Sequence, residues 1–276
     1  MTYHILDSGN GKRLEQIGEY ILIRPYSQAL WKERLPLKQW QNAHAEFKGM
    51  LEGGSGKWVF HKPVPREFIF RYGGISFKCR LTDYGHTGFF FEQHENWKWL
   101  EKKVRPDGHY LNLFAYTGGS TFAVAKKAKV THVDASKSVI QWARENAELS
   151  SIPSTSVRWI TEDAFSFVKR ELKRENKYDG IILDPPAFGR GPQGEIWKLE
   201  KDFMPLLESC RKLLSPNPHL VLLTAHSPGM NHYVLHHCMQ DVFKEMGGGI
   251  FSGDMFLNEA DSDRTIPLGF YARWEK

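Results

Sequence analysis

Two apolar runs in this chain stop abruptly at clusters of turn residues. The run that begins at Leu111 stops at Thr117-Gly118-Gly119, and the run that begins at Ile181 stops at Asp184-Pro185-Pro186. Apolar runs of this length are typical of buried parallel strands that feed loops. In open parallel sheets the ligand binds beyond the carboxyl ends of the strands. The two clusters are therefore expected to face one crevice that binds a small molecule.

From residue 93 onward, strand patterns alternate with helical ones. Helices are predicted between the strands, with Ser136 as the N-cap of one of them. Alternation of this kind implies right-handed crossovers and parallel pairing. The pattern predicts a Rossmann-like, doubly wound α/β domain over 93–276. Its seven expected strands lie at 109–114, 130–133, 157–160, 180–183, 219–224, 250–256 and 266–274.

Residues 1–92 differ from the rest, because they are rich in aromatic residues and glycine and show short alternating runs. Such runs between turn signals predict a small β-rich N-terminal domain. One helix is expected near 37–52, closed by the glycine-rich turn 53–56. This domain is a candidate platform for the substrate, although its tryptophans serve equally well as core.

Composition narrows the class of protein only modestly. The chain has 276 residues and a net charge of +5, which permits a polyanionic partner without demanding one. Its three cysteines are scattered and form no metal-ligand spacing, so no metal is expected and a reducing compartment is favoured. No signal peptide and no run of membrane-spanning length is visible. The sequence thus predicts a cytoplasmic protein without a membrane partner.

Three strand ends carry groups suited to an adenosine ligand. The glycines at 118 and 119 allow a close approach of backbone to ligand, and Asp134 can accept hydrogen bonds from ribose hydroxyls. The group 162–164 places a carboxylate where an adenine amino group can donate. Each feature alone has an ordinary alternative, a turn or a helix cap. Their order at three successive strand ends favours the adenosine ligand.

The first of these turns decides among adenosine ligands. It lacks the Gly-x-Gly-x-x-Gly spacing of dinucleotide sites and the Gly-Lys-Ser/Thr of a P-loop. A loop without a phosphate cradle suits a ligand without phosphates, such as S-adenosylmethionine. A nicotinamide oxidoreductase on a similar sheet is disfavoured by the same spacing but stays open.

At three places the sequence resembles the class I S-adenosylmethionine-dependent methyltransferases. These are 88–93 (Gly-Phe-Phe-Phe-Glu-Gln), 112–119 (Asn-Leu-Phe-Ala-Tyr-Thr-Gly-Gly) and 183–188 (Leu-Asp-Pro-Pro-Ala-Phe). More narrowly, they resemble the branch that modifies bases of large-subunit ribosomal RNA. That branch has Asp-Gln-Arg where this chain has Glu92-Gln93-His94, so the role of the arginine does not carry over.

The resemblance implies roles for individual residues. Phe114, Tyr116 and Gly118 would line the methionine end of the cofactor, and Asp134 would bind the ribose. Asp163 and Ala164 would contact the adenine, and Gln93 would help to hold the cofactor from the domain junction. The alternative is that Glu92 and Gln93 only cap the helix that follows them. The remaining positions expected at the cofactor are Asn112, Thr117, Ala135, Ser136, Asp184 and Pro185.

The chemical step is expected at Asp184. The two prolines after it stiffen the turn, and Asp184 can hydrogen-bond the cofactor or the acceptor nitrogen. Phe188 can stack on a base swung out of its helix; the alternative places Phe188 in the core of a plain connection. Residues 189–194 are expected to form a mobile lid in which Arg190 could meet a phosphate.

The nature of the acceptor follows from a missing cysteine. Methylation of cytosine at carbon 5 needs a thiolate that adds to the ring, and related cytosine enzymes carry a cysteine after the fifth strand. His226 stands at that place here, which argues against carbon-5 chemistry. His226 is expected to line the acceptor pocket, as a base or as a histidine satisfied at a strand end.

These observations predict an S-adenosylmethionine-dependent methyltransferase acting on a base nitrogen in RNA, with ribosomal RNA as the expected substrate. Asp184, Phe188 and His226 are the candidate catalytic residues. Methylation of a small molecule or a protein stays open as an alternative. So does a module that binds the cofactor without catalysis, although the intact Asp-Pro-Pro-Ala-Phe argues against it.

Overall fold

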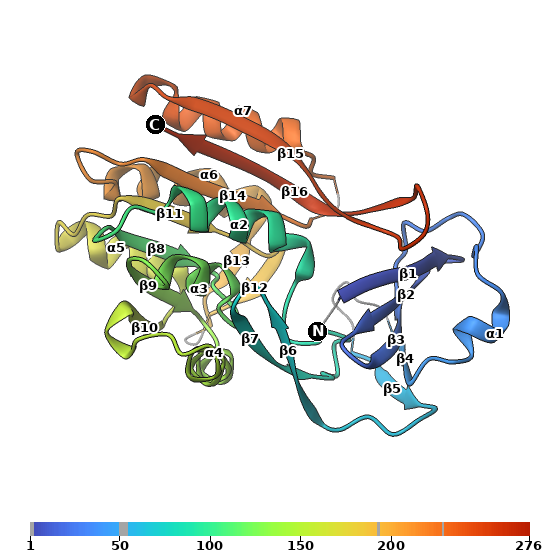
Figure 1. Ribbon diagram of the computed structural model, residues 1–276. Helices are drawn as coiled ribbons and strands as arrows, with labels where there is room; N and C mark the ends of the chain where they lie inside the picture. Colours follow the sequence, from blue (N-terminus) through green and yellow to red (C-terminus); the bar gives the residue numbers. More distant parts are fainter. Residues whose placement is uncertain (1–2, 50–54, 192–193, 228) are drawn as a thin grey trace. The chain divides into compact units, whose positions relative to one another are not determined.

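The computed structural model describes residues 3–49, 55–191, 194–227 and 229–276. The chain divides into two compact units (Figure 1). The first consists of Met1–Phe91 and Phe256–Pro267, and the second of Glu92–Met255 and Leu268–Lys276. The segment Phe256–Pro267, expected to complete the larger domain, instead groups with the first unit.

The first unit is rich in strands, as the sequence predicted. Five of them form one sheet in the order β1-β2-β3-β4-β5, and β6 and β7 form a separate antiparallel pair. A short helix, α1 (Leu37–Trp40), lies between β3 and β4. The strands are β1 (Tyr3–Gly9), β2 (Lys12–Ile17), β3 (Tyr20–Pro25), β4 (Ala45–Lys48), β5 (Lys57–Phe60), β6 (Glu67–Tyr72) and β7 (Ile75–Arg80).

The helix expected near 37–52 is wrong over most of its length. Only Leu37–Trp40 is helical, and Ala45–Lys48 is a strand that pairs with β3 on one side and β5 on the other. Ladder hydrogen bonds on both sides of Ala45–Lys48 outweigh the intrinsic helical preference of its alanine, glutamate and lysine. Residues 50–54, which include part of the predicted glycine turn, lie outside the described residues.

The second unit contains the predicted seven-stranded sheet, in the order β10-β9-β8-β11-β14-β16-β15. The first five strands in this order pair in parallel, and β16 runs antiparallel to β14. This is a Rossmann-like arrangement, so the fold class expected from the sequence is confirmed. The strands are β8 (His109–Leu113), β9 (Lys129–Asp134), β10 (Val157–Thr161), β11 (Gly180–Leu183), β14 (Leu220–Ala225), β15 (Gly249–Asn258) and β16 (Thr265–Glu275).

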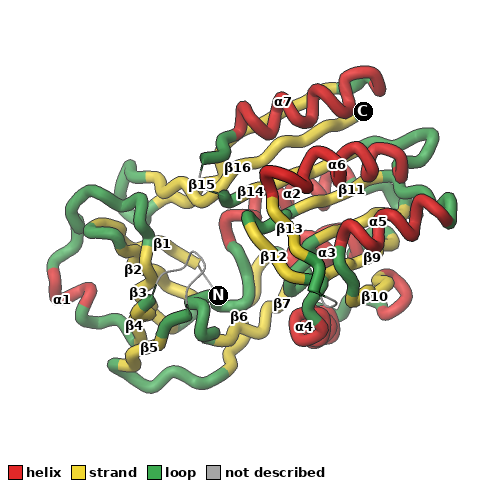
Figure 2. Tube along the Cα trace, turned by 180° about the vertical axis from the view of Figure 1, so that it is seen from behind, coloured by secondary structure: helices red, strands yellow, loops and turns green. Residues whose placement is uncertain are grey.

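Helices cover both faces of this sheet (Figures 1 and 2). Helices α2 and α3 pack together on one face, and α5, α6 and α7 follow one another on the other. The described helices show none that is long and apolar enough to cross a bilayer. The six helices are α2 (His94–Lys103), α3 (Gly119–Ala125), α4 (Lys137–Leu149), α5 (Ala164–Lys173), α6 (Leu199–Leu213) and α7 (His232–Phe243).

The core explains why the strand ends are fixed in place. Alternate residues of β8, β11 and β14, such as Leu113, Leu183 and Leu223, are fully buried in one cluster with side chains of α5, α6 and α7. Strands buried on both faces have one register that keeps their apolar side chains out of water. The residues immediately after β8, β9, β11 and β14 are therefore brought together at one edge of the sheet.

Candidate active site

The turn after β8 has an unusual backbone. Phe114 and Tyr116 have positive φ angles of 55° and 48°, a region that non-glycine residues rarely adopt. Each such residue costs about 1–3 kcal/mol and persists where neighbouring groups hold it. Here the Tyr116 N–H donates to Asp134 Oδ2 at 3.0 Å, and the Thr117 carbonyl accepts from the Asn146 side chain at 3.1 Å.

The two glycines of this turn serve different purposes. Gly118 has a φ of 102° and begins α3 as its N-cap, so its positive φ requires glycine. A Cβ on Gly119 would lie 2.5 Å from Cζ2 of Trp97, a contact that no real side chain makes. Gly119 is therefore explained by the packing of α3 against α2.

Asp134 ends β9 with a carboxylate that still has acceptor capacity. Its Oδ2 accepts from Tyr116 N and its Oδ1 accepts from Ser136 N, each at 3.0 Å. Burial raises the pKa of Asp134, although these two backbone donors oppose the shift. Each oxygen has a second lone pair, which fits a pair of ribose hydroxyls. Ser136 caps α4 as predicted, since its hydroxyl accepts from Val139 N at 3.4 Å.

Two other predicted cofactor residues have structural partners. Asp163 is the N-cap of α5, and its Oδ1 accepts from Ser166 N at 2.8 Å. Asn112 is buried within β8, and its side-chain amide donates to Thr121 Oγ1 of α3 at 2.9 Å. The Asn112 side chain therefore links β8 to α3.

Asp184, directly after β11, is the centre of a hydrogen-bond network. Its Oδ1 accepts from Thr224 Oγ1 at 2.6 Å, and its Oδ2 accepts from Gln93 Nε2 at 3.2 Å. The Nε2 of His226 lies 3.4 Å from Oδ1. Burial would raise the pKa of Asp184, but His226 and the two other donors lower it. The carboxylate is thus held ionised, with both of its oxygens engaged.

Gln93 does not cap α2 through its side chain, as the simpler interpretation supposed. Helix α2 has Gln93 at its N-cap without a side-chain capping bond. The side-chain Nε2 of Gln93 instead donates to Asp184 Oδ2 and to Thr224 Oγ1, the latter at 3.1 Å. The side-chain Oε1 of Gln93 accepts from Asn96 Nδ2 at 2.7 Å. Thr224 was missed by the sequence analysis; the signal was a hydroxyl near the end of an otherwise apolar strand.

His226 is the positive partner of Asp184. Its Nδ1 lies 2.7 Å from the carbonyl oxygen of Leu268, and a carbonyl only accepts, so Nδ1 carries a proton. Desolvation would lower the pKa of His226, but the Asp184 carboxylate outweighs it and, with a smaller contribution from Glu92, raises it to about 9. A third of the side chain (33%) is exposed. His226 is therefore an imidazolium at neutral pH.

The position of this ring depends on a glycine. A Cβ on Gly269 would lie 2.8 Å from His226 Nδ1 and 2.9 Å from the Ala225 carbonyl oxygen, and Gly269 has a φ of 147°. Any side chain there would displace the imidazole from the Leu268 carbonyl.

The segment after the prolines is a β-hairpin, which the sequence analysis missed. Strand β12 (Phe188–Arg190) pairs with β13 (Ile196–Lys198), so the described part of the expected lid is ordered in a ladder; residues 192–193 lie outside it. Phe188 is 52% exposed, which contradicts the interpretation that places it in the core. The glycines at 189, 191 and 194 indicated a loop, whereas the large apolar residues Phe188 and Trp197 are typical of strands.

No cysteine accompanies this network among the described residues. Cys210 is fully buried in α6, and burial raises the pKa of its thiol. Cys238 lies in α7 with its pKa raised by the same cause. The described residues also contain no group of three side chains that could hold a metal ion.

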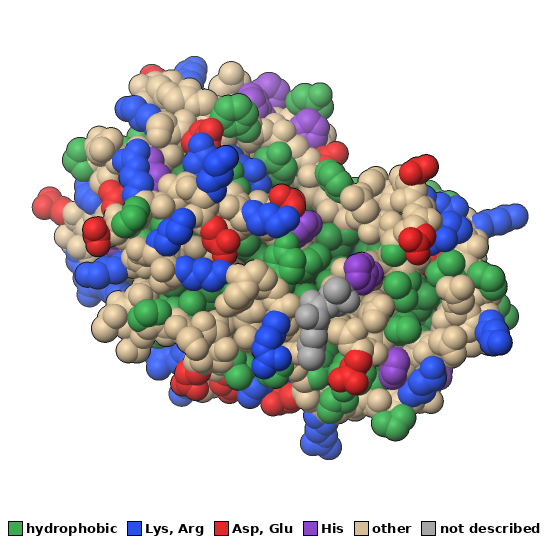
Figure 3. Space-filling model, in the orientation of Figure 1, with side chains coloured by type: hydrophobic (Ala, Val, Ile, Leu, Met, Phe, Trp, Pro, Cys, Tyr) green, Lys and Arg blue, Asp and Glu red, His purple; other side chains and the backbone are tan. Residues whose placement is uncertain are grey.

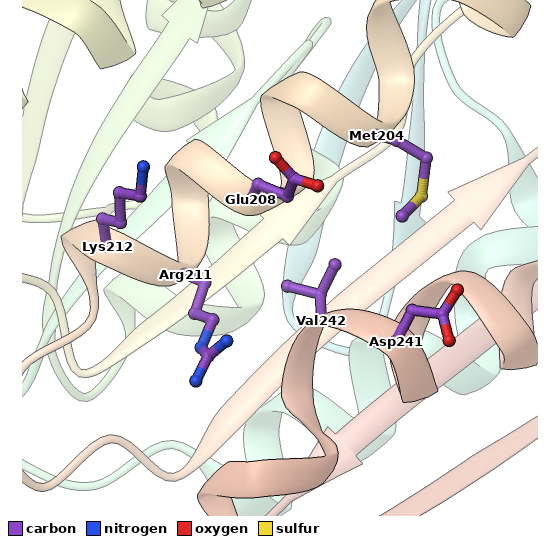
Figure 4. Close-up of a pocket in the computed structure, with 6 residues that line it drawn as sticks. All are labelled: Met204, Glu208, Arg211, Lys212, Asp241 and Val242. Carbon is purple, nitrogen blue, oxygen red and sulfur yellow. The ribbon is translucent and has the colours of Figure 1, made fainter.

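A separate cavity of about 470 Å³ lies between α6 and α7 (Figure 4). It is lined by Met204, Glu208, Arg211, Lys212, Asp241 and Val242. None of the predicted site residues is among them, so this cavity is distinct from the Asp184 network.

Comparison with known proteins identifies the family. The model of the S-adenosylmethionine-dependent methyltransferases matches residues 24–241, well over half of the chain. The chain belongs to this family. A solved methyltransferase from Agrobacterium tumefaciens is 40% identical, with a TM-score of 0.93 over 99% of this chain and 90% of that one. The methyl donor is therefore S-adenosylmethionine, as the first turn predicted.

The curated relatives match a smaller part of this methyltransferase than the Agrobacterium tumefaciens structure does. Ribosomal RNA large subunit methyltransferase K/L of Pseudoalteromonas atlantica is 35% identical over 151 residues, which are 54% of this chain. A Methanocaldococcus jannaschii protein, provisionally named a ribosomal RNA large subunit methyltransferase, is 40% identical over 124 residues. The methyltransferase spans only 21% and 32% of the lengths of these two relatives.

The network makes one prediction about His226 itself. Nitrogen-detected NMR should show protons on both ring nitrogens at about pH 7.5, because the folded pKa lies near 9. Asp184→Asn removes the carboxylate and should bring the transition down to the ordinary histidine range or below. His237→Asn, an exposed residue of α7, should leave the His226 signal unchanged. A neutral His226 ring in the wild-type protein at that pH would contradict this description.

Proposed function

We propose that this methyltransferase transfers a methyl group from S-adenosylmethionine to a base nitrogen of RNA, with large-subunit ribosomal RNA as the substrate. The observation that carries the proposal is the network around Asp184, whose carboxylate accepts from Gln93 and Thr224 and lies 3.4 Å from Nε2 of His226. The names of the curated relatives support the choice of RNA.

The residues of the first three strand ends fit the methyl donor. Asp134 keeps two free lone pairs for the ribose hydroxyls, and the strained turn at Phe114 and Tyr116 would line the methionine end with Gly118. Asp163 and Ala164 would meet the adenine at the start of α5. When bound, the donor supplies an electrophilic methyl group on a sulfonium.

The charge state of the network selects the kind of acceptor. His226 holds its protons at neutral pH and therefore cannot accept another, and its charge lowers the pKa of Asp184, which makes that carboxylate a weak base. A neutral nitrogen with an accessible lone pair needs only orientation toward the donor. A hydroxyl oxygen must lose a proton, and carbon 5 of cytosine needs a thiolate. The network therefore favours a nitrogen, with His226 as a hydrogen-bond donor to the substrate.

The proposal also includes a cytoplasmic location and a role for residues 1–92. The three cysteines are all free, which supports the cytoplasmic location expected from the sequence. We propose residues 1–92 as a separate β-rich domain that serves as a substrate platform. No membrane partner is proposed.

Asp134 provides a test of the donor site that does not depend on the acceptor. Asp134→Asn should weaken binding of S-adenosylhomocysteine about 10- to 100-fold in calorimetric titration, because it removes a charged acceptor. Asp241→Asn in the α6–α7 cavity is the control and should bind like the wild type. Wild-type affinity in Asp134→Asn, with an unchanged melting temperature of the free protein, would rule out the ribose role.

The acceptor is tested with S-adenosylmethionine carrying a labelled methyl group. Unmodified large-subunit ribosomal RNA transcripts should take up label, and mass spectrometry of the digested nucleosides should find it on a base nitrogen. Asp184→Asn should lower the incorporation at least tenfold, and Asp241→Asn should not. Label found only in proteins or small molecules of a cell extract would replace RNA with those substrates.

A further inference from the structure

The β12–β13 hairpin has two chemically different faces. Its ladder pairs Phe188 with Lys198, Gly189 with Trp197, and Arg190 with Ile196. Side chains alternate across a strand, and directly paired residues share a face. One face therefore carries Phe188, Arg190, Ile196 and Lys198, and the other carries Trp197 with the bare Gly189. We call these the outer and the inner face.

The inner face anchors the hairpin to the active site. Trp197 is only 5% exposed, and its Nε1 donates to the Pro186 carbonyl oxygen at 2.7 Å. Its ring centroid lies 5.1 Å from that of Phe114, in the turn after β8. The hairpin is thus fastened both to the proline turn after β11 and to the turn after β8.

The outer face exposes apolar and cationic side chains together. Phe188 is 52% exposed and Ile196 is 54% exposed. The guanidinium carbon of Arg190 lies 5.9 Å from the centre of the Phe188 ring. Within the described part of the chain, no carboxylate forms an ion pair with Arg190 or Lys198. An exposed aromatic ring flanked by cations is the combination that binds single-stranded nucleic acid.

We propose that this outer face binds the RNA strand next to the nucleotide that is methylated. A base stacks on Phe188, and phosphates pair with Arg190 and Lys198. Phe188 follows Asp184 by four residues, so an extended chain places them at most about 14 Å apart, within reach of neighbouring nucleotides. The inference rests on the proposed function for its choice of RNA.

The small size of the outer face favours RNA over a protein partner. The outer face has four side chains, two of them charged, whereas a stable protein interface needs an area several times larger. On the face shown in Figure 3, lysine and arginine side chains are scattered among acidic ones and form no single basic patch. Specific contact with RNA therefore depends on small local sets of aromatic and cationic groups such as this one.

The test measures binding of a fluorescent, mixed-sequence single-stranded RNA of about 12 nucleotides by anisotropy over a range of salt concentrations. Phe188→Ala should weaken binding about 5- to 100-fold with little change in salt dependence, because it removes stacking. Phe188→Tyr should restore it. The control Phe251→Ala, an aromatic residue of β15 that is 55% exposed, should bind like the wild type.

The cations are tested by the slope of log Kd against log salt. Arg190→Ala with Lys198→Ala should reduce this slope by about 1.4, since each single-strand phosphate contact contributes about 0.7. The control pair Lys173→Ala and Lys244→Ala removes the same charge from exposed positions and should change the slope little. S-adenosylhomocysteine binding by calorimetry should be unchanged in every hairpin variant, which shows that the inner face is intact.

Each failure has its own pattern. Hairpin variants that bind RNA like the wild type overturn the inference even if the wild-type protein methylates ribosomal RNA. Wild-type protein that binds no RNA overturns it as well. Selective loss of RNA binding in the hairpin variants supports it, even where ribosomal RNA proves not to be the methylated substrate.

Discussion

The ion pair between Asp184 and His226 organises the candidate active site of this methyltransferase. Asp184 ends β11, and its partners come from the start of α2, from β14 and from the residue after β14. Thr224 and His226 meet Asp184 because β11 lies beside β14 and the core fixes both registers. A carboxylate in this position would be costly to bury without such donors. The ionised state of Asp184 therefore depends on the strand order that brings Thr224 and His226 beside it.

The turn after β8 and the turn after β11 are connected through Trp197. The ring of Trp197 packs on Phe114 in the first of these turns, and its Nε1 donates to the carbonyl oxygen of Pro186 in the second. The strained backbone at Phe114 and Tyr116 is held from the other side by Asp134. Groups that would hold a methyl donor and groups that would orient an acceptor thus belong to one continuous set of contacts. Orientation of two reactants accounts for much of the rate of such a transfer.

Much of the fold, and the strand ends that form the candidate site, could be predicted from the sequence. Buried parallel strands appear as apolar runs ended by turn residues, so β8, β9, β11 and β14 were placed closely. The residues that follow them, such as Asp134 and Asp184, were recognisable because polar groups at strand ends of an open sheet share one edge. The cofactor class followed from the absence of a phosphate cradle.

What could not be read depends on long-range contacts. Strand β4 forms because two neighbours pair with it, and the hairpin after Asp184 was hidden by its glycines. The buried partner of Asn112 and the glycine contact with Trp97 require the packed helix α3. The charge of His226 requires Asp184 from another strand and the Leu268 carbonyl. A histidine in a sequence shows neither its protonation nor its partner.

The pH dependence of methyl transfer tests the central claim most directly. With both substrates saturating, the rate should be level between about pH 6 and 8 and should fall above about pH 9, as His226 loses its proton and the pair is broken. The raised pKa of His226 and the lowered pKa of Asp184 both keep the pair intact in this range. A rate that instead rises with a midpoint near 6.5, the ordinary histidine value, and disappears in His226→Asn would show that His226 acts as a base and would contradict the account.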